Sequence, residues 1–98
     1  MPLRIDPERN EIRALKSTAQ WRGKGVLEVG CGDGRLTLRL ARLGANIHAI
    51  DPDPKLIHAA RRNLPERLTG RVRYQVGNAE QLKYSNDTYD LVVFSWVL

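Results

Sequence analysis

The chain has 98 residues, of which 42% are hydrophobic and 28% are charged, and its formal net charge is +5. This length accommodates one domain, and the composition excludes disordered and collagen-like chains. No stretch approaches the roughly 20 apolar residues that span a membrane, so we expect a cytoplasmic protein without a membrane partner. The single cysteine excludes an internal disulfide, and the absence of zinc-type Cys/His spacing predicts no metal.

Residues 1–25 are predicted to form a lead-in that contains one helix. Asp6-Pro7-Glu8 combines a capping aspartate, a proline at the first helical position and an acid, which together favour a helix start. The apolar face of this helix ends near Ser17, and Gly23 and Gly25 then interrupt the chain. We expect the domain proper to occupy residues 26–98.

Short apolar segments and amphipathic segments alternate through the rest of the chain. The predicted strands are VLEV (26–29), NIHAI (46–50), VRYQV (72–76) and LVVFSWVL (91–98). One predicted helix is capped by Asp33 and ends at Gly44, which suits a left-handed position. A second has the cap Asp53 followed by Pro54 and runs to about Asn63. Strands that alternate with helices predict an α/β fold with a parallel sheet.

The last predicted strand is apolar at successive positions, as expected of a strand that is buried on both faces. The sequence ends on this strand, at Leu98, without a polar tail. We therefore expect a Rossmann-like sheet with flanking helices that is truncated after its fourth strand, and a chain that is a fragment of a longer enzyme. The outer edge of the fourth strand is then expected to be unpaired and prone to association.

A glycine-rich turn follows the first predicted strand. Its glycines, which allow positive φ and close approach of a ligand, are Gly30, Gly32 and Gly34. Asp51 ends the second predicted strand about 20 residues later, the spacing expected of an acid that binds ribose hydroxyls. The dinucleotide fingerprint needs a further glycine where this chain has Arg35, and Glu28 beside the loop disfavours a pyrophosphate. The pattern thus favours an adenosine cofactor with a cationic group over NAD.

Four segments in order resemble the motifs of class I S-adenosylmethionine-dependent methyltransferases, in particular the small-molecule, type 11-like group. VLEVGCGDGRLT resembles the first motif, Asp51-Pro52 the second, GNAEQL the third and YDLVVFSWVL the fourth. This resemblance covers residues 26–98. It implies S-adenosyl-L-methionine as the cofactor and transfer of its methyl group to a small-molecule acceptor.

The resemblance also implies a set of cofactor-binding residues, comprising Glu28, Gly30, Cys31, Gly32, Gly34, Asp51, Pro52, Asn78, Ala79 and Ser95. Glu28 matches the acid that holds the glycine loop and the methionine end, Asp51 the acid on the ribose, and Pro52 the neighbour of adenine. Asn78 replaces the usual aspartate near the adenine amine and keeps a carbonyl oxygen without the charge. Lys83 replaces the usual proline of that loop.

No catalytic residue is assigned, because methyl transfer from a sulfonium needs chiefly a positioned acceptor and the cofactor brings the leaving group. A base, if the acceptor requires one, is expected beyond Leu98. Cys31 is interpreted as a small residue that fills the loop and not as a nucleophile. Asp90 is either structural or adjacent to the cofactor, and Phe94 is expected in the core.

Two other functions remain open from the sequence. A non-catalytic module that binds the cofactor or nucleic acid would use the basic residues Arg61, Arg62, Arg67, Arg71 and Arg73, although no aromatic residues alternate with them to stack bases. An aminopropyltransferase would use a decarboxylated form of the same cofactor on the same fold.

Overall fold

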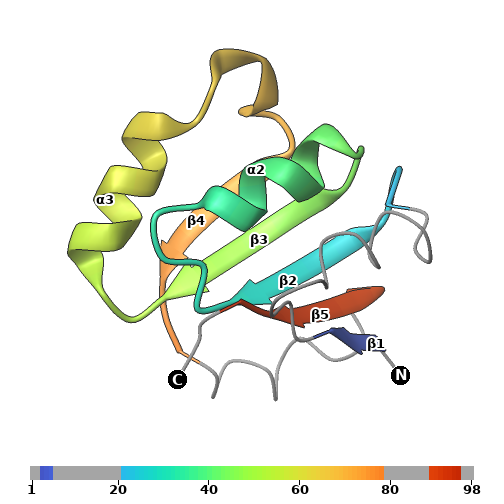
Figure 1. Ribbon diagram of the computed structural model, residues 1–98, viewed down its shortest axis with the longest axis horizontal. Coiled ribbons are helices and arrows are strands. Elements are labelled where there is room, and N and C mark those ends of the chain that lie inside the picture. The colour runs from blue at the N-terminus through green and yellow to red at the C-terminus, as the bar shows by residue number, and fades with distance from the viewer. Residues whose placement is uncertain (1–2, 6–20, 79–88, 96–98) are drawn as a thin grey trace.

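The computed structural model describes residues 3–5, 21–78 and 89–95, which form one parallel sheet with helices against it. The strands lie in the order β1-β5-β2-β3-β4 (Figure 1). Their bounds are β1 Leu3–Ile5, β2 Gly25–Val29, β3 Asn46–Asp51, β4 Val72–Val76 and β5 Leu91–Phe94. Helix α2 (Arg35–Arg42) connects β2 to β3, while helix α3 (Pro54–Asn63) and the 3-10 turn η1 (Glu66–Leu68) connect β3 to β4.

Helices α2 and α3 pack on the same face of the sheet (Figure 1). Because side chains alternate along a strand, every second residue of a strand faces these helices. The resulting core joins Val26 and Ile47 of the sheet to Leu40 of α2 and Ile57 of α3, all buried. Trp21, which precedes β2, is buried in the same core.

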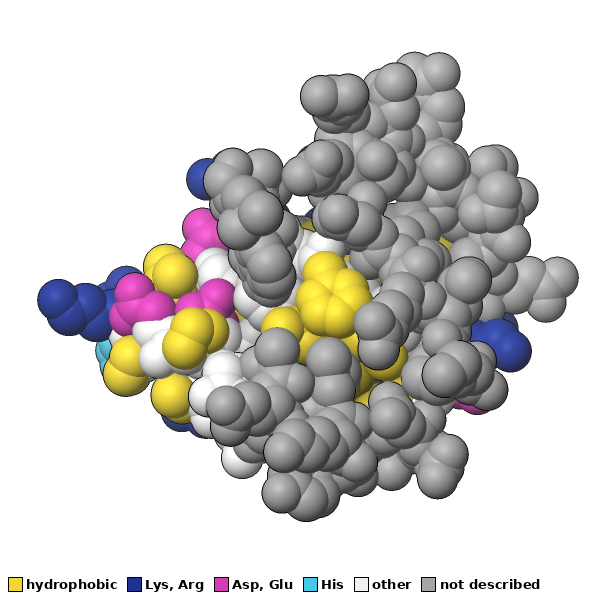
Figure 2. All heavy atoms as spheres, turned by 90° about the horizontal axis from the view of Figure 1, so that it is seen from below, with side chains coloured by type: hydrophobic (Ala, Val, Ile, Leu, Met, Phe, Trp, Pro, Cys, Tyr) yellow, Lys and Arg dark blue, Asp and Glu magenta, His cyan; other side chains and the backbone are white. Residues whose placement is uncertain are grey.

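The intervening strand residues form a second apolar cluster on the other face of the sheet. Leu27, Val29, Ile50 and Val92 are buried there, and Phe94 packs against them. Figure 2 shows hydrophobic side chains in the middle of this face. Phe94, which was expected in the core, is partly buried at the border of this cluster.

The predicted fold class and most predicted elements are confirmed. α3 begins after Asp53, whose carboxylate accepts a hydrogen bond from the Lys55 amide at 2.9 Å, so this residue is the cap that the sequence indicated. Gly44 follows α2 with a φ of +100°, the predicted left-handed position. The helix predicted from Asp6 and residues 96–98 of the last strand lie outside the described residues.

Asp33 does not cap α2, contrary to the prediction. The residue at the cap position is Gly34, with a φ of 92° and no side-chain hydrogen bond to the first turn. The Asp33 side chain instead forms an ion pair with Arg35 at 3.5 Å. The glycine loop continues one residue further than expected, and this places the Asp33 carboxylate outside capping geometry.

The sheet contains a strand that the sequence analysis did not predict. β1 lies parallel to β5, with Leu3 opposite Leu91 and Ile5 opposite Val93. The expectation that the outer edge of the last strand is unpaired is therefore wrong, because β5 pairs with β1 on that side and with β2 on the other. Three residues, Leu-Arg-Ile, are too few to show a strand periodicity, so this pairing depends on the presence of β5.

The strand order reverses at β2, from which the chain first builds outward through β3 and β4 and later returns to add β5. In open parallel sheets, ligands bind beyond the carboxyl ends of the strands at this reversal point. We therefore expect a ligand site at the loops that follow β2, β3 and β5.

Gly44 provides a test of the α2–β3 connection. A Cβ at this position would lie 2.9 Å from Arg22 Cα, and the positive φ is unfavourable for any side chain. We expect Gly44→Ala to lower the free energy of unfolding by about 1–3 kcal/mol in urea denaturation. Gly70→Ala is the control, because a Cβ there meets nothing within 4 Å, and it should change stability by less than about 0.5 kcal/mol. Equal losses in both variants would contradict this account.

Candidate cofactor-binding site

The glycine loop of residues 30–34 folds back over the end of β3. Gly30, Gly32 and Gly34 have φ values of +79°, +58° and +92°. The amides of Gly30 and Cys31 both donate to the Ile50 carbonyl, at 2.8 and 3.0 Å. A single carbonyl at the end of the neighbouring strand thus anchors the start of the loop, and the positive φ values let the chain turn there.

Asp51 connects the glycine loop to the start of α3. Its Oδ2 accepts a hydrogen bond from the Gly32 amide at 3.0 Å, and its Oδ1 accepts one from the Asp53 amide at 2.9 Å. The side chain is 7% exposed, and the Asp51 carbonyl also accepts from the Gly77 amide at 3.0 Å. Because each carboxylate oxygen has a further lone pair, Asp51 holds the loops and still has acceptor capacity for a ligand.

Glu28 lies beneath the loop and is completely buried, with 0% exposure. Its Oε1 accepts a hydrogen bond from the Thr37 hydroxyl of α2. Its Oε2 is buried without a hydrogen-bond partner among the described residues. Burial raises the pKa of this carboxyl, hydroxyl contacts with Ser95 and Thr37 lower it, and the nearby Asp51 charge raises it further.

Tyr74 of β4 packs against the first turn of α2. A Cβ at Gly34 would collide with its hydroxyl, so this glycine is required by the packing of the protein itself. Burial raises the pKa of Tyr74 to about 12, while the hydroxyl of Thr37 lowers it. The phenol therefore remains protonated.

Gly32 differs from Gly34 in having space above it. A Cβ on Gly32 would meet no atom of the described residues within 4 Å, although the residue is only partly exposed. The φ of +58° by itself favours glycine at this position, and the space above it is open. We call this open space the cradle. The Gly32 amide is held by the Asp51 carboxylate, and the acid Glu28 lies buried on the preceding strand, β2.

The remaining predicted site residues come from the ends of neighbouring strands. Pro52 and Asn78 are exposed and follow β3 and β4. Ser95 follows β5, and its hydroxyl donates to the Gly30 carbonyl at 2.9 Å, so it supports the loop from the other side. The fold thus brings all these positions to one edge of the sheet, whereas Ala79 and Lys83 lie outside the described residues.

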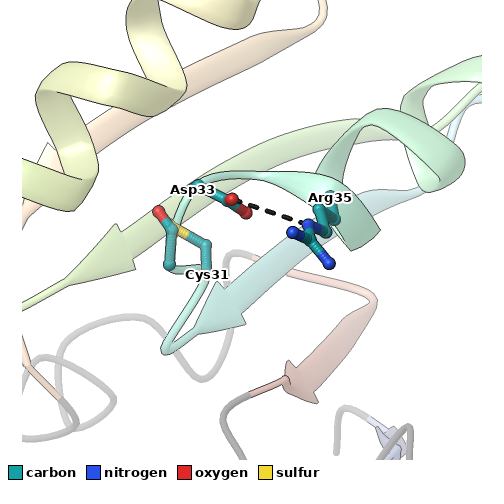
Figure 3. Close-up of polar contacts among 4 residues, drawn as sticks. Cys31, Asp33 and Arg35 are labelled. Carbon is teal, nitrogen blue, oxygen red and sulfur yellow. Dashed lines mark hydrogen bonds and ion pairs between the residues drawn. The ribbon is translucent and has the colours of Figure 1, made fainter.

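Cys31 and Asp33 lie within the loop, and Figure 3 shows Asp33 directed toward Arg35. Cys31 is buried, and burial together with the charges of Glu28 and Asp51 raises the pKa of its thiol. A protonated thiol is a poor nucleophile, which agrees with the interpretation of Cys31 as a loop-filling residue.

Asp90 is structural. Its carboxylate accepts a hydrogen bond from the Gly25 amide at 2.8 Å, and its own amide donates to the Gly25 carbonyl at 2.8 Å. Gly25 begins β2, and parallel strands place their amino ends together. Asp90 therefore lies at the edge opposite the glycine loop.

Sequence reasoning did not identify Thr37 and Tyr74 as part of the site. Both are buried side chains with hydroxyl groups, and both contribute to the surroundings of the loop. A threonine at an inward position of α2, between Leu36 and Leu40, is the signal that was available. Nothing in the sequence of β4 distinguishes Tyr74 from an ordinary core aromatic residue.

The acids Glu28 and Asp51 lie near the carboxyl edge of the sheet. Figure 2 shows acidic side chains together with Lys or Arg side chains at the end of the molecule toward which the strands point. Glu28 and Asp51 have no salt-bridge partner within the part of the chain that the structure describes. In that part, no group of three or more His, Cys, Asp or Glu residues is arranged to hold a metal ion. The edge therefore offers uncompensated acids to a cationic ligand.

A family model described as "Methyltransferase domain" matches residues 26–98. A magnesium-protoporphyrin O-methyltransferase from Rhodobacter capsulatus is 45% identical over 56 residues, covering 57% of this chain and 25% of that protein. A mitochondrial ubiquinone biosynthesis O-methyltransferase from Schizosaccharomyces pombe is 38% identical over 78 residues, covering 78% of this chain and 28% of that protein. The chain thus spans less than a third of the length of these relatives.

Solved structures share the fold. A structure described as a putative S-adenosylmethionine-dependent methyltransferase from Listeria monocytogenes has a TM-score of 0.73 at 27% identity, covering 91% of this chain and 41% of that one. The magnesium protoporphyrin IX methyltransferase of Synechocystis, solved with bound S-adenosylmethionine, has a TM-score of 0.73 at 25% identity. It covers 87% of this chain and 40% of that one.

Glu28→Gln tests the protonation of the buried carboxyl. Because burial raises the folded pKa above 4.5, the unfolded chain loses its proton first as the pH rises. The wild-type free energy of unfolding should therefore fall from pH 4.5 up to the folded pKa. Gln cannot ionise, so the variant should lack this decline and be the more stable protein at about pH 8.

Urea denaturation of wild type and variant, at pH 4.5 and again at about pH 8, measures this difference in the free energy of unfolding. Glu66→Gln, a change of the same kind on the exposed turn η1, is the control and should retain the wild-type decline. A wild-type free energy of unfolding that does not fall relative to the variant between pH 4.5 and about pH 8 would contradict a raised pKa for this carboxyl.

Proposed function

We propose that this chain, which belongs to the methyltransferase domain family, forms the S-adenosylmethionine-binding part of a methyltransferase that acts on a small-molecule acceptor. The observation that carries this proposal is the open cradle above Gly32, between the buried acids Glu28 and Asp51. The match over residues 26–98 and the names of the relatives support the reaction class.

The residues of the edge fit a cofactor that carries positive charge. S-adenosylmethionine has an ammonium and a sulfonium, and Glu28 Oε2 is a buried acceptor without a partner among the described residues. A cation near this carboxyl would favour its ionised form and lower its pKa. We therefore expect cofactor binding to release a proton from Glu28 wherever the free protein holds it neutral.

We assign the ribose hydroxyls to the free lone pairs of Asp51 and the adenine to the exposed strip formed by Pro52 and Asn78. Gly30, Cys31, Gly32 and Gly34 would line the methionine side with their backbone, and Ser95 supports them through the Gly30 carbonyl. Ala79 continues the adenine side by its place in the sequence. These roles rest on the resemblance together with the shared position of the described residues at one edge.

The bound cofactor supplies a methyl group on a sulfonium, which is electrophilic without help from a protein acid or base. The residues of this chain bind and orient it, since the loop is held by Ile50, Asp51 and Ser95 and needs little rearrangement. Such preorganisation lowers the entropic cost of bringing the reactants into line. No described residue is required to transfer a proton in this reaction.

An aminopropyltransferase would use the same cradle with decarboxylated cofactor, but both relatives named above are O-methyltransferases. A preference for S-adenosylmethionine over its decarboxylated form in calorimetry separates the two functions.

No helix among the described residues is long and apolar enough to cross a membrane. The cytoplasmic location expected from the sequence stays a prediction.

Gly32→Ala tests the cradle. The added methyl would occupy the open space above the loop, so we expect affinity for S-adenosylmethionine to fall at least about tenfold, which corresponds to about 1.4 kcal/mol. Gly23→Ala is a matched control, because Gly23 has a φ of +76° and its Cβ would also meet nothing within 4 Å. Gly23 lies at the opposite edge, and its variant should bind normally.

Isothermal calorimetry measures binding, and thermal unfolding measures the backbone strain, which should be similar in the two variants. If Gly32→Ala binds the cofactor as wild type does, the loop is a steric turn and the proposal fails.

Asp51→Ala should weaken S-adenosylmethionine binding by about ten- to a hundred-fold, because hydrogen bonds to a charged acceptor contribute about 1.5–3 kcal/mol each. It also removes the acceptor that holds the Gly32 amide. Asp33→Ala is the control, since the Asp33 carboxylate pairs with the exposed Arg35. Calorimetry on both variants decides the assignment, and equal effects would contradict it.

A further inference from the structure

A second polar feature lies at the amino edge of the sheet, away from the glycine loop. It is a hollow of about 310 Å³ whose lining includes four arginines, Arg22, Arg42, Arg67 and Arg71. They come from the segment before β2, the last turn of α2, η1 and the segment before β4. We call this feature the arginine hollow. Because the strands are parallel, the segments that line it lie at the opposite edge of the sheet from the glycine loop (Figure 1).

Gly44 contacts two of these arginines, Arg22 and Arg71. Arg71 Nη1 donates to the Gly44 carbonyl at 3.0 Å, and the Gly23 amide donates to the same oxygen at 2.9 Å. Arg22 packs so closely on Gly44 that a Cβ there would meet its Cα at 2.9 Å. The Arg71 guanidinium is therefore fixed before any ligand arrives, which reduces the entropy lost on binding.

The positive charge of the arginine hollow is not balanced locally. No Asp or Glu of the described residues lines it. The end of α2 accounts for Arg42, because a cation is favourable near helix carbonyls. It does not account for Arg67 on η1, which is exposed at the same hollow. Four arginines that line one hollow without a carboxylate would be stabilised by an anion.

A neighbouring hollow of about 330 Å³ shares Arg71 but is less suited to an anion. His48 lies in it, and burial, followed by the charge of Arg73, lowers its pKa. Arg73 contacts His48 Nδ1 at 3.2 Å and can only donate, so Nδ1 accepts and Nε2 donates to the Gln75 amide oxygen at 2.7 Å. These polar groups already satisfy one another, which leaves the arginine hollow as the binding feature.

We propose that the arginine hollow binds a small ligand that carries one or two phosphate groups. The planar guanidinium forms paired hydrogen bonds to phosphate oxygens, and a phosphate offers enough acceptors for several such groups at once. A single carboxylate has two oxygens and would leave most of these donors unused. The hollow is large enough for a diphosphate and lies apart from the proposed cofactor residues, so both ligands can bind together.

Calorimetry with pyrophosphate, and separately with inorganic phosphate, tests the proposal. The double variant Arg42→Ala/Arg67→Ala removes two exposed guanidinium groups that form no hydrogen bond or ion pair with the other described residues. We expect its pyrophosphate affinity to fall at least about tenfold. The matched control is Arg39→Ala/Arg62→Ala, which removes the same charge from exposed helix positions outside the hollow and should bind pyrophosphate within about twofold of wild type.

S-adenosylmethionine affinity, measured on the same proteins, should be unchanged in both double variants, which separates this site from the proposed function. The proposal is overturned if wild type does not bind pyrophosphate with saturation, or if both double variants lose affinity equally. A single-stranded RNA oligonucleotide is the third ligand. Binding of RNA without binding of pyrophosphate would also overturn the proposal, because it would show a surface for a long polyanion in place of a phosphate pocket.

Discussion

The candidate site depends on one carboxylate, that of Asp51. Its two oxygens accept from the Gly32 amide at 3.0 Å and from the Asp53 amide at 2.9 Å, so the loop after β2 and the start of α3 are fixed to a single buried group. Charge-assisted hydrogen bonds of this kind are stronger than neutral ones. The same side chain that offers acceptors to a ligand thus also sets the shape of the loop that would receive it.

The buried carboxyl group of Glu28, beneath this loop, is energetically unfavourable. A fully buried carboxyl with one unpartnered oxygen, as in Glu28, costs stability unless it is protonated or paired. Thr37 compensates one oxygen only. A core built for stability alone would place an apolar residue here, so the cost is consistent with a site that awaits a cationic ligand. The raised pKa of Glu28 then makes cofactor affinity dependent on pH.

The parallel sheet gives the molecule two chemically different edges. The acids Glu28 and Asp51 lie near the carboxyl ends of β2 and β3, and the glycines lie in the loop after β2, whereas segments before the strands carry Arg22 and Arg71. All strand starts meet at one edge because every connection crosses over and returns. The buried acids Glu28 and Asp51 and the arginine hollow therefore lie at opposite edges, although each is assembled from residues that are scattered along the chain.

The sequence alone determined the α/β class, the three positive-φ glycines and the cap at Asp53, because each depends on local periodicity or on the conformational freedom of single residues. Tertiary structure decided what depends on contacts between distant segments. The three residues of β1 are too few to show a strand pattern, and they form a strand only by pairing with β5. Asp33 does not cap α2, because Gly34 occupies the cap position. The contacts around Glu28 and the arginine hollow arise only when several elements meet, so no local pattern in the chain encodes them.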